Sequence, residues 1–504
     1  MILPEQWMAR MLVTISDLHL TDGTSDKTLS PEAFFLFAER LRELATRAAW
    51  RADGQFRPLE RIDVLLLGDI LDILHSRHWV EGTIRPWHDT SHVDVQGTFA
   101  AVIDGILAHN AEGLGMLRAL ATQGALCMAP AMSGGAALPG NEVYRVPVRI
   151  HYMVGNHDWP LHLPGAAYDL MRQKVCQHLG LANHPHLPFA HDPYESDEIL
   201  EVLRRHRAMA RHGDMFDPLH FAEDRDISSL GDALMIEVVG RFLHTTQNEL
   251  ASELPPLVLA NLHEVDNVRP LPMIPIFIDG LLERACPSPA LRKHVKQLWD
   301  KHVDQFLSLD VVRRRDTWLP FDVVDGLANV LRFSSRSTIG WAVKADAWMQ
   351  AMRGASSPSY ASHAIAEQDF RNRRARHILY GHTHTAECVP LDASHADGYV
   401  LNQVYFNTGT WRRVHRPTIA APHEQEFIPC ESMNLVTLFA GDERAGRPFE
   451  VWSGMMGIGA ADAPLYRLDA AKAQAAATPA APPLKAPHFS APATSSSRSL
   501  TARR

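Results

Sequence analysis

The sequence predicts a mixed α/β domain, and three features of the chain lead to this prediction. Short apolar runs of strand length end in glycine or a charged residue, as residues 64–67 do before Gly68 and Asp69. Residues 31–50 have helical spacing and lie between two such runs, as in a βαβ unit. Segments rich in β-branched and aromatic residues follow later in the chain. We therefore expect polar turns at the carboxyl edge of a sheet, where α/β folds bind ligands.

The first helix is expected to start after Ser30, which is a favourable N-cap, with Pro31 at the first helical position. Further helical spacing is found at residues 97–122 and 168–181. Residues 399–407, 433–439 and 448–452 are predicted to be antiparallel strands that form a second sheet.

Four strand-like runs lead into polar turns of similar design, and a fifth turn of the same kind lies between the last two. The turns are Asp17-Leu18-His19, Gly68-Asp69-Ile70-Leu71-Asp72, Gly155-Asn156-His157-Asp158, Arg211-His212-Gly213-Asp214 and Gly381-His382-Thr383-His384. Carboxylate and imidazole ligands suit borderline divalent ions such as manganese, iron, zinc or cobalt. Cysteine is absent from these turns, which argues against a structural zinc site and favours an open, catalytic one.

The order of these turns resembles the calcineurin-like metallophosphoesterase superfamily over residues 11–384. The resemblance implies a four-layer α-β-β-α sandwich. It also implies hydrolysis of a phosphate monoester, diester or pyrophosphate bond by a hydroxide held on two divalent ions. Manganese is the first choice of ion, with iron, zinc, cobalt or nickel as alternatives. The implied ligands are Asp17, His19 and His384 for one ion, Asn156, His212 and His382 for the other, and Asp69 as the bridge.

Residues beside the implied ligands have expected roles of their own. His157 follows Asn156 directly, so it can reach the departing oxygen from the same turn and protonate it. Three carboxylates are expected to be partners of histidines, and an asparagine to support the turn of the histidine pair. These residues are Asp72, Asp158, Asp214 and Asn407.

The substrate remains open at the level of sequence. The chain is partly similar to the UDP-2,3-diacylglucosamine pyrophosphatases, but those enzymes are shorter and generally have arginine where this chain has His157. A nucleotide-sugar pyrophosphatase is therefore the alternative, and a nuclease or an inactive metal-binding scaffold comes third. The net charge of −9 argues against a nucleic-acid partner. We expect a phosphorylated small molecule, nucleotide or lipid-linked substrate.

Domain organisation is indicated by changes in pattern along the chain. Residues 1–460 are predicted to form the metallophosphoesterase domain, in which residues 228–355 have recurrent helical spacing without a strand motif. This helical insertion either roofs the metal site or packs on the outside of the sheet. Residues 461–504 are rich in Ala, Pro and Ser, and we expect a disordered tail.

Two groups of loop residues remain with open roles. The first group either contacts substrate or consists of ordinary loop residues: His75, His78, Trp79, Trp87, His88 and His92. The second group has no carboxylate at ligand spacing and is expected at the surface: His184, His186 and His191.

Composition indicates an ordinary soluble protein, with 46% hydrophobic and 21% charged residues. Its five cysteines are scattered, and no apolar run reaches the length of a membrane span. The first residues lack the pattern of a secretion signal, so we expect a cytoplasmic protein.

Overall fold

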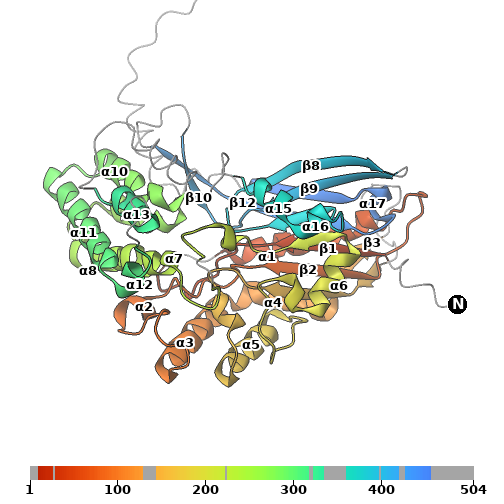
Figure 1. Cartoon of the computed structure of the whole chain (residues 1–504), viewed down its shortest axis with the longest axis horizontal. Helices are drawn as coiled ribbons and strands as arrows, with labels where there is room; N and C mark the ends of the chain where they lie inside the picture. Colours follow the sequence, from red (N-terminus) through yellow and green to blue (C-terminus); the bar gives the residue numbers. More distant parts are fainter. Residues whose placement is uncertain are drawn as a thin grey trace, which may run out of the picture. The chain divides into compact units, whose positions relative to one another are not determined.

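The chain has a mixed α/β fold, seen in a computed structural model (Figure 1). The structure describes residues 9–25, 29–128, 143–221, 224–316, 322–333, 359–396, 399–418 and 426–455. The expected tail at 461–504 and the expected helical segment at 339–352 lie outside these ranges.

The first sheet has five strands in the order β13-β12-β1-β2-β5. Strand β1 pairs in parallel with β2, and β2 pairs in parallel with β5. Helix α1 joins β1 to β2, so the expected βαβ unit is confirmed. The elements are β1 (Arg10–Ile15), α1 (Pro31–Ala48), β2 (Arg61–Leu67), β5 (Val148–Met153), β12 (Ser432–Phe439) and β13 (Phe449–Met455).

The second sheet has four strands in the order β6-β7-β9-β8. Strands β6, β7 and β9 are parallel, and β8 pairs antiparallel with β9. The elements are β6 (Ala208–Ala210), β7 (His377–Tyr380), β8 (Ala386–Ala396) and β9 (Tyr399–Thr408).

The prediction of one late antiparallel sheet was partly wrong. Residues 399–407 belong to the second sheet, where β9 is parallel to β7. Strands β12 and β13 instead extend the first sheet, because β12 pairs antiparallel with β1. Residues Met433 to Phe439 of β12 are all buried, which fits a strand covered on both faces.

Alternate side chains of the strands enter different apolar clusters. Leu12 and Leu65 of the first sheet share a cluster with Leu379 and Phe406 of the second. Their sequence neighbour Val13 faces a different cluster, formed with α1, α3, α4 and α5. The two sheets therefore share a buried core, which brings their polar turns together. These helices are α3 (Val93–His109), α4 (Ala111–Gln123) and α5 (Ala166–Leu179).

A helical region at 230–331 lies between β6 and β7 in the sequence and is coloured green in Figure 1. Predicted helical segments at 230–245, 274–284, 291–309 and 323–333 are confirmed, with a π-helical segment at Met235–Gly240 within the first. Trp299 donates its indole N–H to the carbonyl of Leu331, which ties α11 to α13. The helices are α7 (Leu230–Leu234), α8 (Arg241–Leu250), α9 (Pro256–Leu262), α10 (Ile274–Ala285), α11 (Pro289–Leu307), α12 (Asp310–Arg313) and α13 (Val323–Leu331).

Shorter elements complete the fold. The helices are α2 (Arg77–Glu81), α6 (Asp197–Arg205), α15 (Ala361–Ala366), α16 (Gln368–Arg371) and α17 (Glu443–Gly446). The strands are β3 (Ala125–Met128), β4 (Val143–Val146), β10 (Val414–Pro417) and β11 (Phe427–Cys430). Among the helices that the structure describes, none combines the length and the apolar character that crossing a bilayer requires.

Candidate metal centre

The polar turns have an unusual backbone conformation. Five of their side-chain-bearing residues have positive φ angles between 48° and 66°, a region that non-glycine residues rarely enter. Such conformations cost about 1–3 kcal/mol each and concentrate at functional sites. The five residues are Asp17, His19, Asp69, His382 and His384.

Two glycines let these turns approach one another. A Cβ atom on Gly155 would collide with Oδ1 of Asp69 and lie 2.8 Å from Nε2 of His212. A Cβ atom on Gly381 would lie 2.6 Å from Oδ2 of Asp17. The glycines of these motifs are thus needed for close contact between turns of the two sheets.

Asp17, His19 and His384 form the first group of candidate metal ligands, which we call the first ligand group. Nε2 of His384 lies 3.4 Å from Oδ1 of Asp17 and 3.0 Å from Nε2 of His19. Nδ1 of His19 lies 2.9 Å from Oδ2 of Asp72. Since a carboxylate only accepts, this nitrogen carries the proton and leaves the lone pair of Nε2 facing the group. All three side chains are buried.

Asp69, His212 and His382 form the second ligand group, beside Asn156. Nε2 of His212 lies 3.1 Å from Oδ2 of Asp69, while its Nδ1 donates to the carbonyl of Leu67 at 2.9 Å. Nδ1 of His382 lies 2.9 Å from Oδ1 of Asn156. Oδ2 of Asp69 is also 3.8 Å from Nε2 of His19. Asp69 therefore lies between the two groups.

Two buried ligand atoms lack hydrogen bonds. Among the described residues, neither Oδ1 of Asp17 nor Nε2 of His212 has a hydrogen-bond partner, despite their short distances to neighbouring side chains. A buried polar group without a partner costs about 1–3 kcal/mol. Divalent cations among these atoms would satisfy both, and carboxylate and imidazole are suitable donors. The residues present therefore fit a pair of divalent ions.

The charge of the site also fits binding of divalent cations. Burial favours the neutral ring of His212, but the carboxylates of Asp69 and Asp17 outweigh burial and raise its pKa to about 10. Burial likewise opposes ionisation of Asp69, yet His212 and His157 hold the pKa of Asp69 below its usual range. The carboxylates thus attract positive charge, which a metal cation can supply in place of the proton.

Asp72 organises the histidines around the site. Its Oδ1 lies 2.8 Å from Nδ1 of His157, and its Oδ2 lies 2.9 Å from His19 and 2.6 Å from His75. The backbone N–H of His157 donates to Oδ1 of Asp69 at 2.8 Å. Burial disfavours the charged ring of His157, but Asp72 and Asp69 raise its pKa to about 9. The general-acid candidate is thus held beside both ligand groups.

Asp158, Asp214 and Asn407 were also expected to support the implied ligands, and each has a different partner. Asp158 accepts from the backbone N–H groups of Gly155 and Ile70 and from the hydroxyl of Tyr152, rather than contacting a histidine as expected. Its place inside the turn, next to backbone donors, explains the difference.

Asp214 forms a 2.6 Å ion pair with Arg225. Its partner is therefore an arginine from a later segment, although His212 lies close enough to lower the pKa of Asp214 along with that arginine. Asn407 donates to the carbonyl of Gly381 at 2.7 Å, directly before the histidine pair.

Several site residues were not found from the sequence. Asp217 lies 3.3 Å from Nε2 of His382. Nε2 of His75 lies 3.3 Å from Oδ2 of Asp266, which also pairs with Arg412. His75 was named from the sequence only as a loop residue with an open role, whereas Asp217 and Asp266 lie in segments without a strand motif.

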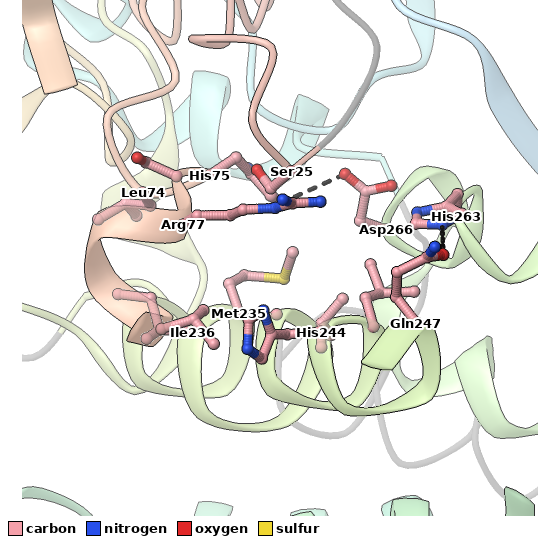
Figure 2. A pocket seen from close by; sticks show the side chains of 15 residues that line it. Ser25, Leu74, His75, Arg77, Met235, Ile236, His244, Gln247, His263 and Asp266 are labelled. Atoms are coloured by element: carbon pink, nitrogen blue, oxygen red, sulfur yellow. Dashed lines mark hydrogen bonds and ion pairs between the residues drawn. The ribbon is translucent and has the colours of Figure 1, made fainter. Parts of the chain in front are cut away.

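The helical region contributes to the site through Asp266, which lies in a 3-10 turn at Val265–Asn267. A pocket of about 550 Å³, including space open to solvent, adjoins His75 and Asp266. Figure 2 shows Met235 and His244 of the helical region facing the segment that carries His75 and Arg77. The insertion thus reaches the ligand groups through the contact of Asp266 with His75.

Burial distinguishes the members of the two groups of loop residues from one another. Of the first group, His75 joins the site and Trp79 packs in the core against Phe99, while His78, His88 and His92 are exposed and Trp87 is partly buried. Of the second group, His184 and His186 are exposed as expected.

The expectation for His191 was wrong. This residue is buried, and its Nε2 lies 3.5 Å from Oδ1 of Asp226. The fold supplies a carboxylate that is distant in sequence, which ligand spacing could not indicate.

The arrangement provides two adjoining ligand groups, a shared carboxylate and a positioned histidine. Such a set can hold divalent ions close together, and a neighbouring imidazole can transfer a proton.

No protein-family model matches this sequence, and a search of curated proteins found no match to it.

Proposed function

We propose that this chain is a phosphoric ester hydrolase that depends on two divalent metal ions and belongs to the calcineurin-like metallophosphoesterase superfamily. The position of Asp69 carries the proposal, because its Oδ2 lies 3.1 Å from His212 of one ligand group and 3.8 Å from His19 of the other. A carboxylate between two ligand groups is suited to bridge two ions.

The arrangement of the sheets supports the family proposal. Ligands of the first sheet follow the parallel strands β1, β2 and β5, and those of the second follow β6 and β7. Apolar clusters lie between the sheets and on their outer faces against helices. Such layering supports the proposed four-layer α-β-β-α sandwich, the architecture that the resemblance implies.

Different residues of the site are proposed to have different chemical roles. When bound, two divalent ions would supply charge stabilisation for phosphoryl oxygens and an activated water. Asp72 engages Nδ1 of His157, so Nε2 is the ring atom left to give a proton to the departing oxygen. The backbone bond from His157 to Asp69 fixes the distance between this proton donor and the bridging carboxylate.

The substrate proposed is a phosphate monoester, diester or pyrophosphate of a small molecule, nucleotide or lipid. His157 favours a phosphatase or phosphodiesterase activity, because the UDP-2,3-diacylglucosamine pyrophosphatases generally have arginine at this position. A nucleotide-sugar pyrophosphatase is the second candidate, favoured by the helical region that reaches the site through Asp266.

A substrate screen tests the proposal. The full chain, loaded with manganese, is assayed with p-nitrophenyl phosphate, bis-p-nitrophenyl phosphate and a UDP-sugar, and its metal content is measured in parallel. We expect hydrolysis of at least one class, which Asp69→Asn abolishes. If the protein binds two ions but hydrolyses none of the three substrates, the result would favour an inactive metal-binding scaffold. If the protein binds no ion at the centre, the proposal would be overturned.

A further inference from the structure

A second cluster of metal-ligand atoms lies apart from the candidate metal centre. It consists of His162, His191 and Asp226, whose ligand atoms all lie within 4.8 Å of one another. None of the three belongs to the ligand groups around Asp69. We propose that this cluster binds one zinc ion, which ties the start of the helical region to the first half of the fold.

The distances within the cluster suit coordination better than hydrogen bonding. Oδ1 of Asp226 lies 3.5 Å from Nε2 of His191 and 3.7 Å from Nε2 of His162. Both distances exceed those of ordinary N–H···O hydrogen bonds. Ligand atoms about 2.0–2.1 Å from a tetrahedral zinc ion lie roughly 3.4 Å from each other, so these separations leave space for the ion.

The buried atoms of the cluster lack other partners. His191 is only 3% exposed, and neither of its ring nitrogens forms a hydrogen bond with the described residues. Oδ1 of Asp226 is likewise buried without a hydrogen bond among those residues. Leaving such atoms unpaired is unfavourable, and an ion at their centre would satisfy Nε2 of His191 and the carboxylate together.

The protonation of the histidines is suited to ligation. Nδ1 of His162 donates to the carbonyl of Phe189 at 2.8 Å, so Nε2 carries the lone pair that faces Asp226. Burial keeps His191 neutral and lowers its pKa to about 4. Neutral imidazole is the form that binds metal.

Surrounding residues hold the ligands in place. Glu195 accepts the backbone N–H of His191 at 2.8 Å, and its Oε2 lies 3.8 Å from Nδ1 of His162. Arg225 donates to the carbonyl of His191 and pairs with Asp214. Two imidazoles and one carboxylate form a ligand set typical of zinc, with a fourth position for water or another donor.

The cluster joins segments of the chain that are distant in the sequence. His162 ends the turn that follows Asp158, His191 lies after the loop that covers this turn, and Asp226 precedes α7. A nearby bond from the indole of Trp159 to Asp232 of α7 already joins the same segments. An ion at the cluster would strengthen this connection beside the candidate centre.

The test measures zinc bound per chain in the full-length protein. We expect Asp226→Asn and His162→Ala to lose one zinc ion each and to weaken binding at that site by more than about 100-fold, since even a residue that only orients a ligand contributes about 10- to 100-fold. Asp226→Asn preserves shape at a residue whose side chain is 41% exposed, so the fold is expected to be retained. Metal-free thermal unfolding of each variant checks this.

His186→Ala is the matched control, because His186 lies exposed in the same loop. It should bind as many zinc ions as wild type. Equal zinc content and affinity in wild type, Asp226→Asn and His162→Ala would overturn the proposal. The result is separate from the proposed function, because the difference of one ion is expected whether wild type binds three ions in total or only one.

Discussion

Nδ1 of His157 lies 2.8 Å from Oδ1 of Asp72, so the second ring nitrogen of His157 is the one available to a substrate. If this nitrogen protonates the leaving group, its loss should matter most for poor leaving groups. We expect His157→Ala to slow esters of basic alcohols by about 10²- to 10⁴-fold, and p-nitrophenyl esters much less. Rates for both substrate types, measured where chemistry limits turnover, provide the comparison.

Metal content separates this role from ligation. His157→Ala should retain near-normal metal, since the hydrogen bond from His157 to Asp69 is made by its backbone N–H, which the substitution keeps. Equal slowing of both substrates would instead mean that His157 acts as a fixed charge on the phosphoryl oxygens. Loss of metal would place the ring among the ligands.

Asp69→Asn should abolish activity and lower metal content without unfolding the protein. The substitution keeps the shape of the side chain but removes the charge shared by the two ligand groups. Metal analysis and circular dichroism of the purified variant test both parts. Asp53→Asn, at an exposed aspartate, is the control and should behave as wild type. Full occupancy and wild-type turnover in Asp69→Asn would remove Asp69 from the site.

Gly155→Ala should weaken metal binding and destabilise the fold. Its Cβ atom would collide with Oδ1 of Asp69, and relief of such overpacking typically costs about 1–3 kcal/mol. Gly115→Ala is the comparison, because no atom lies within 4 Å of that Cβ and the residue lies in a helix. Gly115→Ala should be neutral or stabilising. Denaturant unfolding and metal titration of both variants would reveal the difference, and identical behaviour would contradict the packing argument.

Stability should fall on acidification because of His377. This residue begins β7, and burial together with the charge of Arg376 lowers its pKa to about 3. The unfolded chain takes up a proton near pH 6.5 and the folded chain does not, so stability is complete above pH 6.5 and is lost as the pH falls toward 3. The contribution amounts to about 2 kcal/mol between pH 7 and pH 5.

The substitution His377→Phe should flatten this dependence, since phenylalanine does not titrate and the ring already packs near Phe406 and Phe449. Free energies of unfolding at pH 5, 6 and 7 provide the measurement. His186→Phe, at an exposed position, should keep the wild-type slope. A wild-type slope in His377→Phe would assign the acid sensitivity to other groups.

Local pattern was sufficient to predict that the polar turns meet at one edge, whereas their division into two ligand groups came from the family resemblance. Asp17, Asp69 and Asn156 directly follow parallel strands of one sheet, so strand spacing alone placed them at one edge. His212 and His382 follow the parallel strands of the other sheet in the same way. The backbone requirements of these turns leave a strong signal of glycine and polar residues.

Long-range pairing could not be predicted in the same way. Strands β9 and β12 both contain alternating apolar residues, yet they belong to different sheets, because sheet membership depends on partners distant in sequence. Asp266 and Asp226 reach their histidines through the path of the helical region, and neither has a local motif. Residue spacing within one segment indicates its secondary structure, but it does not indicate which distant segment will pack or pair with it.

The division of the ligands between two sheets has a consequence for the order of events during synthesis. Asp69 follows β2 of the first sheet, but its neighbour His212 follows β6, and His384 follows β7 only after the helical region. A nascent chain that has reached residue 200 would therefore carry carboxylates without most of their histidines. The candidate metal centre could be complete only after the ribosome has passed residue 384, so a chain truncated before that residue would lack part of it.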